Sequence, residues 1–142
     1  MRNLQTTLLY NWFEKVWNKG DSNAIDELMT NYSTAKGILD EDQPKGAAGF
    51  KIFFNDFRNQ FDDISVIVED VVSEDDIEAA RTTVSAIHRE SGKKVSFPGM
   101  CMVKVVNGQI AEAWNNYDFL NLYQQLGHKL TGPAPKNPAL EG

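Results

Sequence analysis

The sequence predicts an α+β fold, with a strongly curved, mainly antiparallel sheet wrapped around N-terminal helices. Up to about residue 61 the apolar residues recur with the period of a helix, and from Asp62-Asp63 to Asp118 they alternate as in strands. The breaks between the later strands are short enough for hairpins, so strands adjacent in the chain pair antiparallel. Because the helices come first and cannot cover both faces of so many strands, we expect them on one side of the sheet.

The first half of the chain predicts three helices and one strand. We expect helices over residues 4–20, 21–29 and 46–61 and a short strand over residues 32–39. The first carries an apolar stripe from Leu4 to Trp17 and ends at Gly20. The third carries five phenylalanines at helical spacing, Phe57 among them, and such a stripe is far more often core than a cofactor site.

The second half predicts four strands and a last helix. We expect strands over residues 64–72, 77–89, 95–106 and 109–118, followed by a helix over residues 119–126. Pro98 and Gly99 inside the third of these strands are candidate bend points, since proline and glycine interrupt regular pairing. Gly127 is a typical residue to end the final helix.

Length and composition set the broad class. The 142 residues suit one domain, and we expect it to span residues 1–127, with a proline-rich tail over residues 128–142. The formal net charge of −6 argues against a nucleic-acid surface. No apolar run has the length of a membrane span or the form of a signal peptide, so we expect a cytoplasmic protein without a membrane partner.

The strongest local signal is Asn107-Gly108 between two alternating runs, which is typical of a two-residue hairpin turn. If the pairing continues without a bulge, Cys101 faces Trp114 and Phe97 faces Asp118. Directly opposed residues share a face of the sheet. One face is then mostly apolar and includes two carboxylates, and it carries Phe97, Gly99, Cys101, Val103, Val105, Ile110, Glu112, Trp114, Asn116 and Asp118. An acid on an apolar surface suggests a site.

A second hairpin, with Ser91-Gly92 as its turn, brings an imidazole to the same face. In this register His88 faces Val95, Ala86 faces Phe97, and Val84 lies on that face too. Two strand spacings of about 4.8 Å separate His88 from Asp118, so a small molecule between them is a reasonable hypothesis. One extra residue in either hairpin would reverse these faces.

Five features are spread along the chain: WNKGD from Trp17, the spacing of Arg81 and His88 in one strand, the run NGQIAEAW, Asp118 four residues after Trp114, and the closing QQLG. Together they resemble the SnoaL-like polyketide cyclases. The resemblance covers roughly residues 5–127. It departs at Ala113 and at Ala35-Lys36, where members of that family often carry histidines, and in the short ESGKK turn.

The resemblance implies a cone-shaped fold with an internal hydrophobic pocket, a small-molecule ligand and frequent homodimers through the outer face of the sheet. It also implies ring closure by cofactor-free acid/base chemistry on a small apolar carbonyl compound, with Asp118 as the acid/base residue and His88 assisting. We expect further pocket residues on strands and helices alike: Trp114, Phe97, Cys101, Val84, Phe57, Tyr10 and Glu112.

Each assignment has a simpler alternative. Asp118 is also a favoured helix N-cap, and a carboxylate that only caps the next helix and points into solvent would speak against the enzyme. Glu112 can be a solvated residue near the hairpin tip. Cys101 reads as a small buried hydrophobe. With one cysteine and two distant histidines no transition-metal site is expected. The alternative function is a non-catalytic domain that binds a small molecule or serves only for dimerisation.

Overall fold

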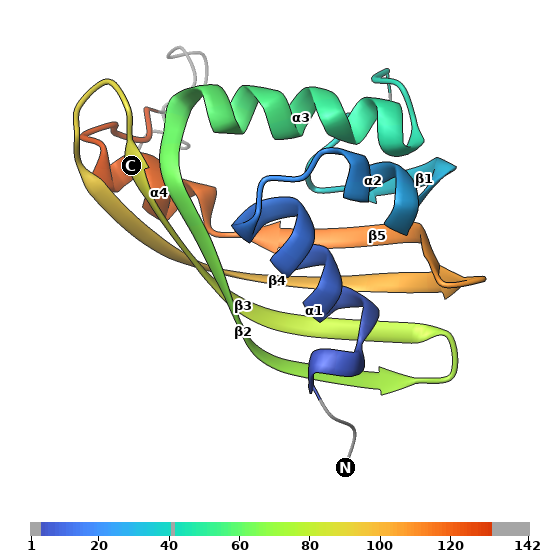
Figure 1. Ribbon diagram of the computed structural model, residues 1–142. Helices are drawn as coiled ribbons and strands as arrows, with labels where there is room; N and C mark the ends of the chain where they lie inside the picture. The colour runs from blue at the N-terminus through green and yellow to red at the C-terminus, as the bar shows by residue number, and fades with distance from the viewer. Residues whose placement is uncertain (1–3, 41, 132–142) are drawn as a thin grey trace, which may run out of the picture.

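The computed structural model describes residues 4–40 and 42–131 of the chain. Within these residues the helices are a 3-10 turn η1 (Leu4–Thr6), α1 (Leu8–Trp12), the π-helical η2 (Phe13–Asn18), α2 (Asn23–Leu28), α3 (Gly46–Gln60) and α4 (Phe119–Gln125). The strands are β1 (Met29–Lys36), β2 (Phe61–Glu74), β3 (Ile77–His88), β4 (Lys94–Val106) and β5 (Gln109–Tyr117). Figure 1 shows the predicted α+β class, with helices on one face of a curved sheet.

The first predicted helix is three consecutive pieces. Thr7 separates η1 from α1 and caps α1, because its hydroxyl accepts a hydrogen bond from the Tyr10 amide at 3.2 Å. The Lys19 amide then bonds the Glu14 carbonyl at 2.9 Å, five residues back, as expected of a π-helical turn. The predicted apolar stripe is nevertheless buried as one surface, formed by Leu9, Trp12, Phe13, Val16 and Trp17.

Two helices pass directly into strands, which moves two predicted boundaries. Met29 ends α2 with extended backbone angles (φ −131°, ψ 137°), so β1 starts there and not at residue 32. Phe61 does the same after α3 (φ −130°, ψ 139°), so this residue begins β2 and is not part of the helical stripe. Each helix therefore places its last turn against the sheet without a loop between.

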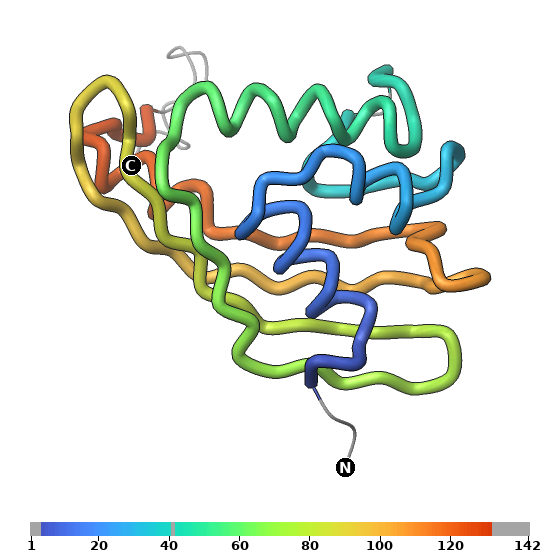
Figure 2. The backbone as a smooth tube through the Cα atoms, viewed as in Figure 1, coloured from blue at the N-terminus to red at the C-terminus, as the bar shows by residue number. Residues whose placement is uncertain are grey.

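The sheet has the order β1-β5-β4-β3-β2. The predicted antiparallel meander from β2 to β5 is confirmed, and β1 adds to its edge in parallel with β5. Figure 2 shows how β2, β3 and β4 curl upward at one end, toward the last turns of α3 and α4. This curvature turns the sheet into a cone that holds the core.

The pairing register locates two bulges on the β2 side of the sheet. Pairing runs without a shift through Pro98 and Gly99, whereas β2 shifts register against β3 between Asp62 and Ser65 and again between Val68 and Asp70. An extra residue in one strand increases local twist and bends it. β2 therefore carries two bulges, whereas Pro98 and Gly99 lie at none, and their role as bend points stays a prediction.

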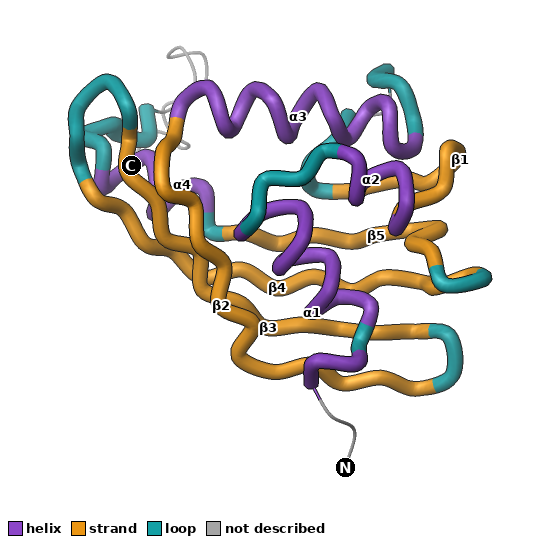
Figure 3. Tube along the Cα trace, viewed as in Figure 1, coloured by secondary structure: helices purple, strands orange, loops and turns teal. Residues whose placement is uncertain are grey.

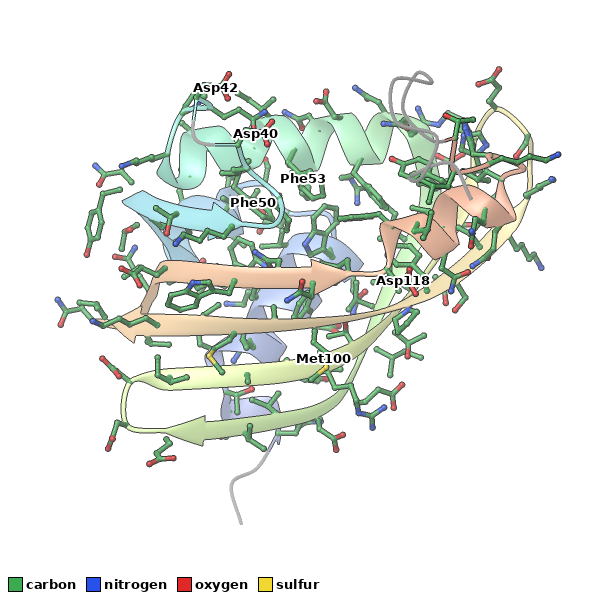
Figure 4. The ribbon with its side chains drawn as sticks, turned by 180° about the vertical axis from the view of Figure 1, so that it is seen from behind. Asp40, Asp42, Phe50, Phe53, Met100 and Asp118 are labelled. Atoms are coloured by element: carbon green, nitrogen blue, oxygen red, sulfur yellow. The ribbon has the colours of Figure 1, made fainter. Side chains whose placement is uncertain are left out.

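Figure 3 shows the helices over the concave face of the sheet, and buried apolar side chains of both layers form one core. Seen from behind, in Figure 4, the opposite face around Met100 has no helix over it. Among the described residues no helix is long and apolar enough to cross a membrane. The predicted tail lies outside the described residues from position 132 onward.

Candidate functional site

One extra residue in β5 decides which side chains enter the cone. The pairs Val106 with Gln109 and Val105 with Ile110 are as predicted, but Lys104 then pairs with Glu112, so Ala111 is a bulge. Beyond it every residue of β5 changes face, because side chains alternate along a strand. The predicted face is therefore wrong for Glu112 and Trp114, and Ala113, Asn115 and Tyr117 point inward in their place.

The inward residues border a cavity between the helices and the sheet. The space open to the centre of a water molecule is about 60 Å³, several times the roughly 10–15 Å³ that one water requires. Nine aromatic side chains line it: Trp12, Phe13, Trp17, Phe50, Phe53, Phe57, Phe97, Tyr117 and Phe119. No Asp, Glu, His, Lys or Arg is among its described lining residues. This cavity suits a compact, uncharged and largely apolar molecule.

The mouth of the cavity is marked by the lining residues that are only partly buried. They come from the loop after β1, from α3, from the end of β5 and from the start of α4, and are Ile38, Phe53, Asn115, Tyr117 and Phe119. Figure 4 shows Phe50 and Phe53 pointing from α3 toward the sheet. A ligand would enter between α3 and the junction of β5 with α4.

Besides the indole N–H groups of Trp12 and Trp17, the polar side-chain groups of the cavity lining are the Cys101 thiol, the Tyr117 hydroxyl and the Asn115 amide. Burial raises the pKa of Cys101 from about 9 to about 12, although hydrogen bonding with Tyr117 counteracts the rise. Burial also raises the pKa of Tyr117 well above its usual value near 10. Both groups are therefore neutral at physiological pH, and the thiol is a poor nucleophile because the thiolate is the reactive form.

Asn115 supplies the polar group of the mouth. Its Nδ2 donates to the Lys36 carbonyl at 3.0 Å, which fixes the amide at the parallel junction of β1 and β5. Gly37 lies directly against the same residue: a Cβ there would come within 2.1 Å of the Asn115 carbonyl oxygen. With Nδ2 engaged, Oδ1 is the amide atom left to accept a hydrogen bond from a ligand.

Asp118 lies outside the cavity. It follows β5, its side chain is exposed, and its Oδ1 accepts a hydrogen bond from the Asn121 amide at 3.0 Å. Its own amide bonds the Pro98 carbonyl, so it does not face Phe97 as predicted. The structure therefore gives Asp118 the capping role that the sequence left as the alternative. Its catalytic role stays a prediction.

His88 is on the predicted face but stands behind the cavity wall. The loop of this hairpin is longer than predicted, so Ala86 and not His88 pairs with Val95, a shift by two that preserves the face. The imidazole lies 5.4 Å from the ring of Phe61, which in turn stacks on Phe57 at 4.5 Å. Its Nδ1 is 2.8 Å from the Ser91 hydroxyl. His88 therefore does not line the cavity, and its role too stays a prediction.

The remaining predicted pocket residues divide in two. Phe97, Cys101, Val84 and Phe57 are in the lining. Tyr10 is half-buried on α1 and is not, and neither are Trp114 and Glu112, which point to the outer face. On β5, the lining residues that the sequence did not predict are Ile110, Ala113, Asn115 and Tyr117. The sequence did contain a signal for the last three. The bulge-free register places the charged Glu112 on an apolar face, and such a placement indicates a bulge in the strand as readily as a functional site.

The chain is similar to one protein family and to solved structures of proteins described in the same terms. A family model for SnoaL-like polyketide cyclases matches residues 7–126. A proposed polyketide cyclase from Bacillus cereus is 28% identical, with a TM-score of 0.73 over 84% of this chain and 78% of its own. IdmH, a proposed polyketide cyclase from Streptomyces antibioticus, is 21% identical (TM-score 0.75, 89% of this chain and 100% of its own).

A more distant neighbour shows how widely this architecture extends. A protein from Catenulispora acidiphila with a ketosteroid isomerase-like fold, solved in complex with trimethylamine, is 10% identical to the chain. Its TM-score is 0.75 over 87% of this chain and 95% of its own. Among curated proteins none matches this sequence.

Proposed function

Because this chain belongs to the SnoaL-like polyketide cyclase family, we propose that it binds a small apolar carbonyl compound in the cone cavity and promotes a cyclisation or isomerisation of it without a cofactor. The observation that carries the proposal is the cavity itself, which is lined mainly by aromatic and aliphatic side chains and, among the described residues, by no charged one. Such a lining favours an uncharged ligand, since a buried charge without a partner is costly.

The lining also suggests how such a reaction is promoted. Its described residues offer no carboxylate or imidazole to carry a proton, so the main contribution we propose is confinement of a flexible substrate in a folded, reactive conformation. Holding two reacting groups together converts a rare encounter into a frequent one. The acid/base form of the reaction, with Asp118 and His88, rests on the family resemblance and requires these groups to reach the mouth.

The binding step can be measured by calorimetric titration with 1-tetralone and 1-decalone, two neutral bicyclic ketones. We expect saturable binding that is lost in Ala113→Phe, because Ala113 is 5% exposed and lines the cavity. Asn116→Phe adds the same ring to an exposed position of the outer face and is the matched control. Absence of binding by the wild type, or binding that survives Ala113→Phe, would overturn the proposal.

Turnover separates the enzyme from the alternative, a non-catalytic binding domain of the same fold. A suitable probe is 2,6-heptanedione, which closes to 3-methylcyclohex-2-enone with loss of water. We expect the protein to accelerate this closure and Ala113→Phe to abolish the acceleration. Ketone binding without any acceleration would favour the binding domain.

We also propose that the chain forms a homodimer through the outer face of the sheet. Exposed apolar side chains gather there around the Arg81–Asp70 ion pair, and the register places Val72 and Met102 in one row and Met100 in the next. An exposed apolar patch of this kind supports association. The partner we propose is a second copy of the chain.

A further inference from the structure

Strand β1 departs from regular pairing with β5 near its start. The paired positions span five steps over Met29–Thr34 on β1 and two steps over Ile110–Glu112 on β5, so β1 has extra residues that interrupt the pairing. Gly46 of α3 packs against the middle of this detour, since a Cβ there would come within 2.3 Å of the Asn31 carbonyl oxygen. The detour is therefore a packed part of the fold.

A second groove lies at the detour. Figure 1 shows β1, α2 and the turn between β4 and β5 at the same end of the sheet, and the groove is lined from these elements and from the start of α3. The space open to the centre of a water molecule is about 460 Å³. Met29 is the one described residue that lines both this groove and the cone cavity. The polar lining residues are Asp26, Thr30, Asn31, Tyr32, Asn107 and Gln109.

Thr30 gives this groove a buried polar atom without a partner. The residue is 7% exposed, and its Oγ1 has no hydrogen-bond partner among the described residues. Its carbonyl, in contrast, accepts a hydrogen bond from the Ser33 hydroxyl at 3.4 Å. Buried hydroxyls are nearly always paired. Because Thr30 lines the groove, a ligand group that enters the groove and reaches this hydroxyl would supply the missing partner.

The charge of the lining argues for a neutral ligand. Asp26 is the one charged residue of the described lining, and its carboxylate is paired with the ammonium group of Lys51 on α3. No described lining residue is basic, so the lining offers no counter-charge to a phosphate or a carboxylate. The groove is therefore better suited to a neutral molecule than to a nucleotide or an organic acid.

The remaining polar groups combine donors and acceptors with one aromatic ring. Gln109 Nε2 donates to the Glu27 carbonyl at 3.2 Å, and its Oε1 is then the amide atom that can accept from a ligand. Asn31 and Asn107 are exposed, and each amide can both donate and accept. The Tyr32 side chain beside them is 58% exposed.

We propose that this groove is a second binding site, for a neutral sugar. Every sugar hydroxyl can donate and accept a hydrogen bond, as the amides and hydroxyls of this lining can. The apolar C–H face of a pyranose ring can lie on an exposed aromatic ring, which Tyr32 provides. The site is independent of the proposed reaction in the cone and adds a ligand class that the cone lining does not suit.

The test is a titration of isotope-labelled protein with the methyl glycosides of glucose, galactose, mannose and rhamnose, followed by the amide signals in NMR spectra. We expect at least one glycoside to bind saturably, with a dissociation constant of about millimolar order, and to shift the signals of Thr30, Asn31 and Asn107. If none of the four saturates, or if the shifts map to the cone lining, the proposal is overturned.

Two variants test the groove directly. Thr30→Val should weaken sugar binding about two- to tenfold without lowering the urea midpoint, because it removes a hydroxyl that has no partner in the free chain. Thr34→Val makes the same change on β1 outside the lining and should leave the affinity unchanged. Asn107→Gly should also weaken binding, and it keeps the turn because the φ of 52° at this position suits glycine. Unchanged affinity in Thr30→Val and Asn107→Gly would overturn the site.

Further titrations separate this site from other ligands and from the cone. Adenosine is the second probe, and binding of adenosine without binding of any glycoside would replace the sugar site by a nucleoside site. Thr30→Val should leave the binding of 1-tetralone in the cone unchanged. Ala113→Phe should leave sugar binding unchanged, and its loss there would place the sugar in the cone and refute a second site. Should Thr30→Val fail to fold, Asn107→Gly decides.

Discussion

Gly99 and Tyr117 are paired across β4 and β5, and the ring of the tyrosine fills the space that any side chain at position 99 would need. The glycine thus serves packing, since pairing is regular there and its φ is not positive. This relationship joins the stability of the sheet to the shape of the cavity.

Gly99→Ala should lower the free energy of unfolding by about 1–3 kcal/mol, because the added methyl group displaces the Tyr117 ring. Urea denaturation measures this loss. In a Tyr117→Ala background the same substitution should cost clearly less, since the ring it displaces is gone. Equal costs in the two backgrounds would show that the clash with Tyr117 is not the cause.

Asp118→Asn distinguishes capping from acid/base catalysis. Asparagine is as good a helix N-cap as aspartate, but its amide cannot act as a general acid or base. If α4 capping is its role, Asp118→Asn should keep both stability and any cyclisation rate, whereas Asp118→Ala should lose about 1 kcal/mol of stability. The measurements are urea denaturation and the closure of 2,6-heptanedione. A large loss of rate in Asp118→Asn at unchanged stability would restore the acid/base assignment.

Glu78 should be a strong determinant of stability. Its carboxylate is buried and accepts hydrogen bonds from the amides of Leu8 (3.1 Å) and Leu9 (2.9 Å), which holds the start of α1 on β3. Glu78→Gln turns one acceptor into a donor that faces another donor, and should cost about 1.5–3 kcal/mol. Glu112→Gln, at an exposed site of the same sheet, is the control and should leave the urea midpoint unchanged.

Cys101 should make the fold sensitive to alkaline pH. Its pKa is raised by burial to about 12 in the folded chain, so between about pH 9 and 12 the unfolded chain loses this proton first. The stability linked to Cys101 is fully present below pH 9 and falls as the pH rises through that window. Between pH 8.5 and 10.5 the Cys101→Val variant should therefore lose less stability than the wild type. Thermal unfolding at the two pH values measures this difference. An identical loss would contradict the assignment.

The outer face of the sheet should carry the dimer contact. Met100 and Met102 are 57% and 45% exposed there, and a lysine at either position would place a charge in the interface. Light scattering after size exclusion should give twice the chain mass for the wild type and the chain mass for Met100→Lys. Ile52→Lys changes a similarly exposed residue on α3 and should remain dimeric. A monomeric wild type would refute the proposal.

Much of the fold could be predicted because periodicity reports local structure. The phenylalanine stripe, the Asn107-Gly108 turn and the meander from β2 to β5 all depend on neighbours in the chain. The parallel pairing of β1 with β5 could not be predicted in this way, because its partners are about eighty residues apart. Nor could the position of the bulge, since Ala111 is an ordinary strand residue by composition.

The sequence by itself determined the fold class, the order of its elements and the apolar character of the concave face, because these follow from spacing along the chain. Only the tertiary structure decided which polar groups enter the cone. A single extra residue at Ala111 turns Glu112 and Trp114 outward and brings Asn115 and Tyr117 inward, since side chains alternate along a strand. A site formed by residues of neighbouring strands depends on the register between those strands, and that register is determined by their pairing in the folded chain.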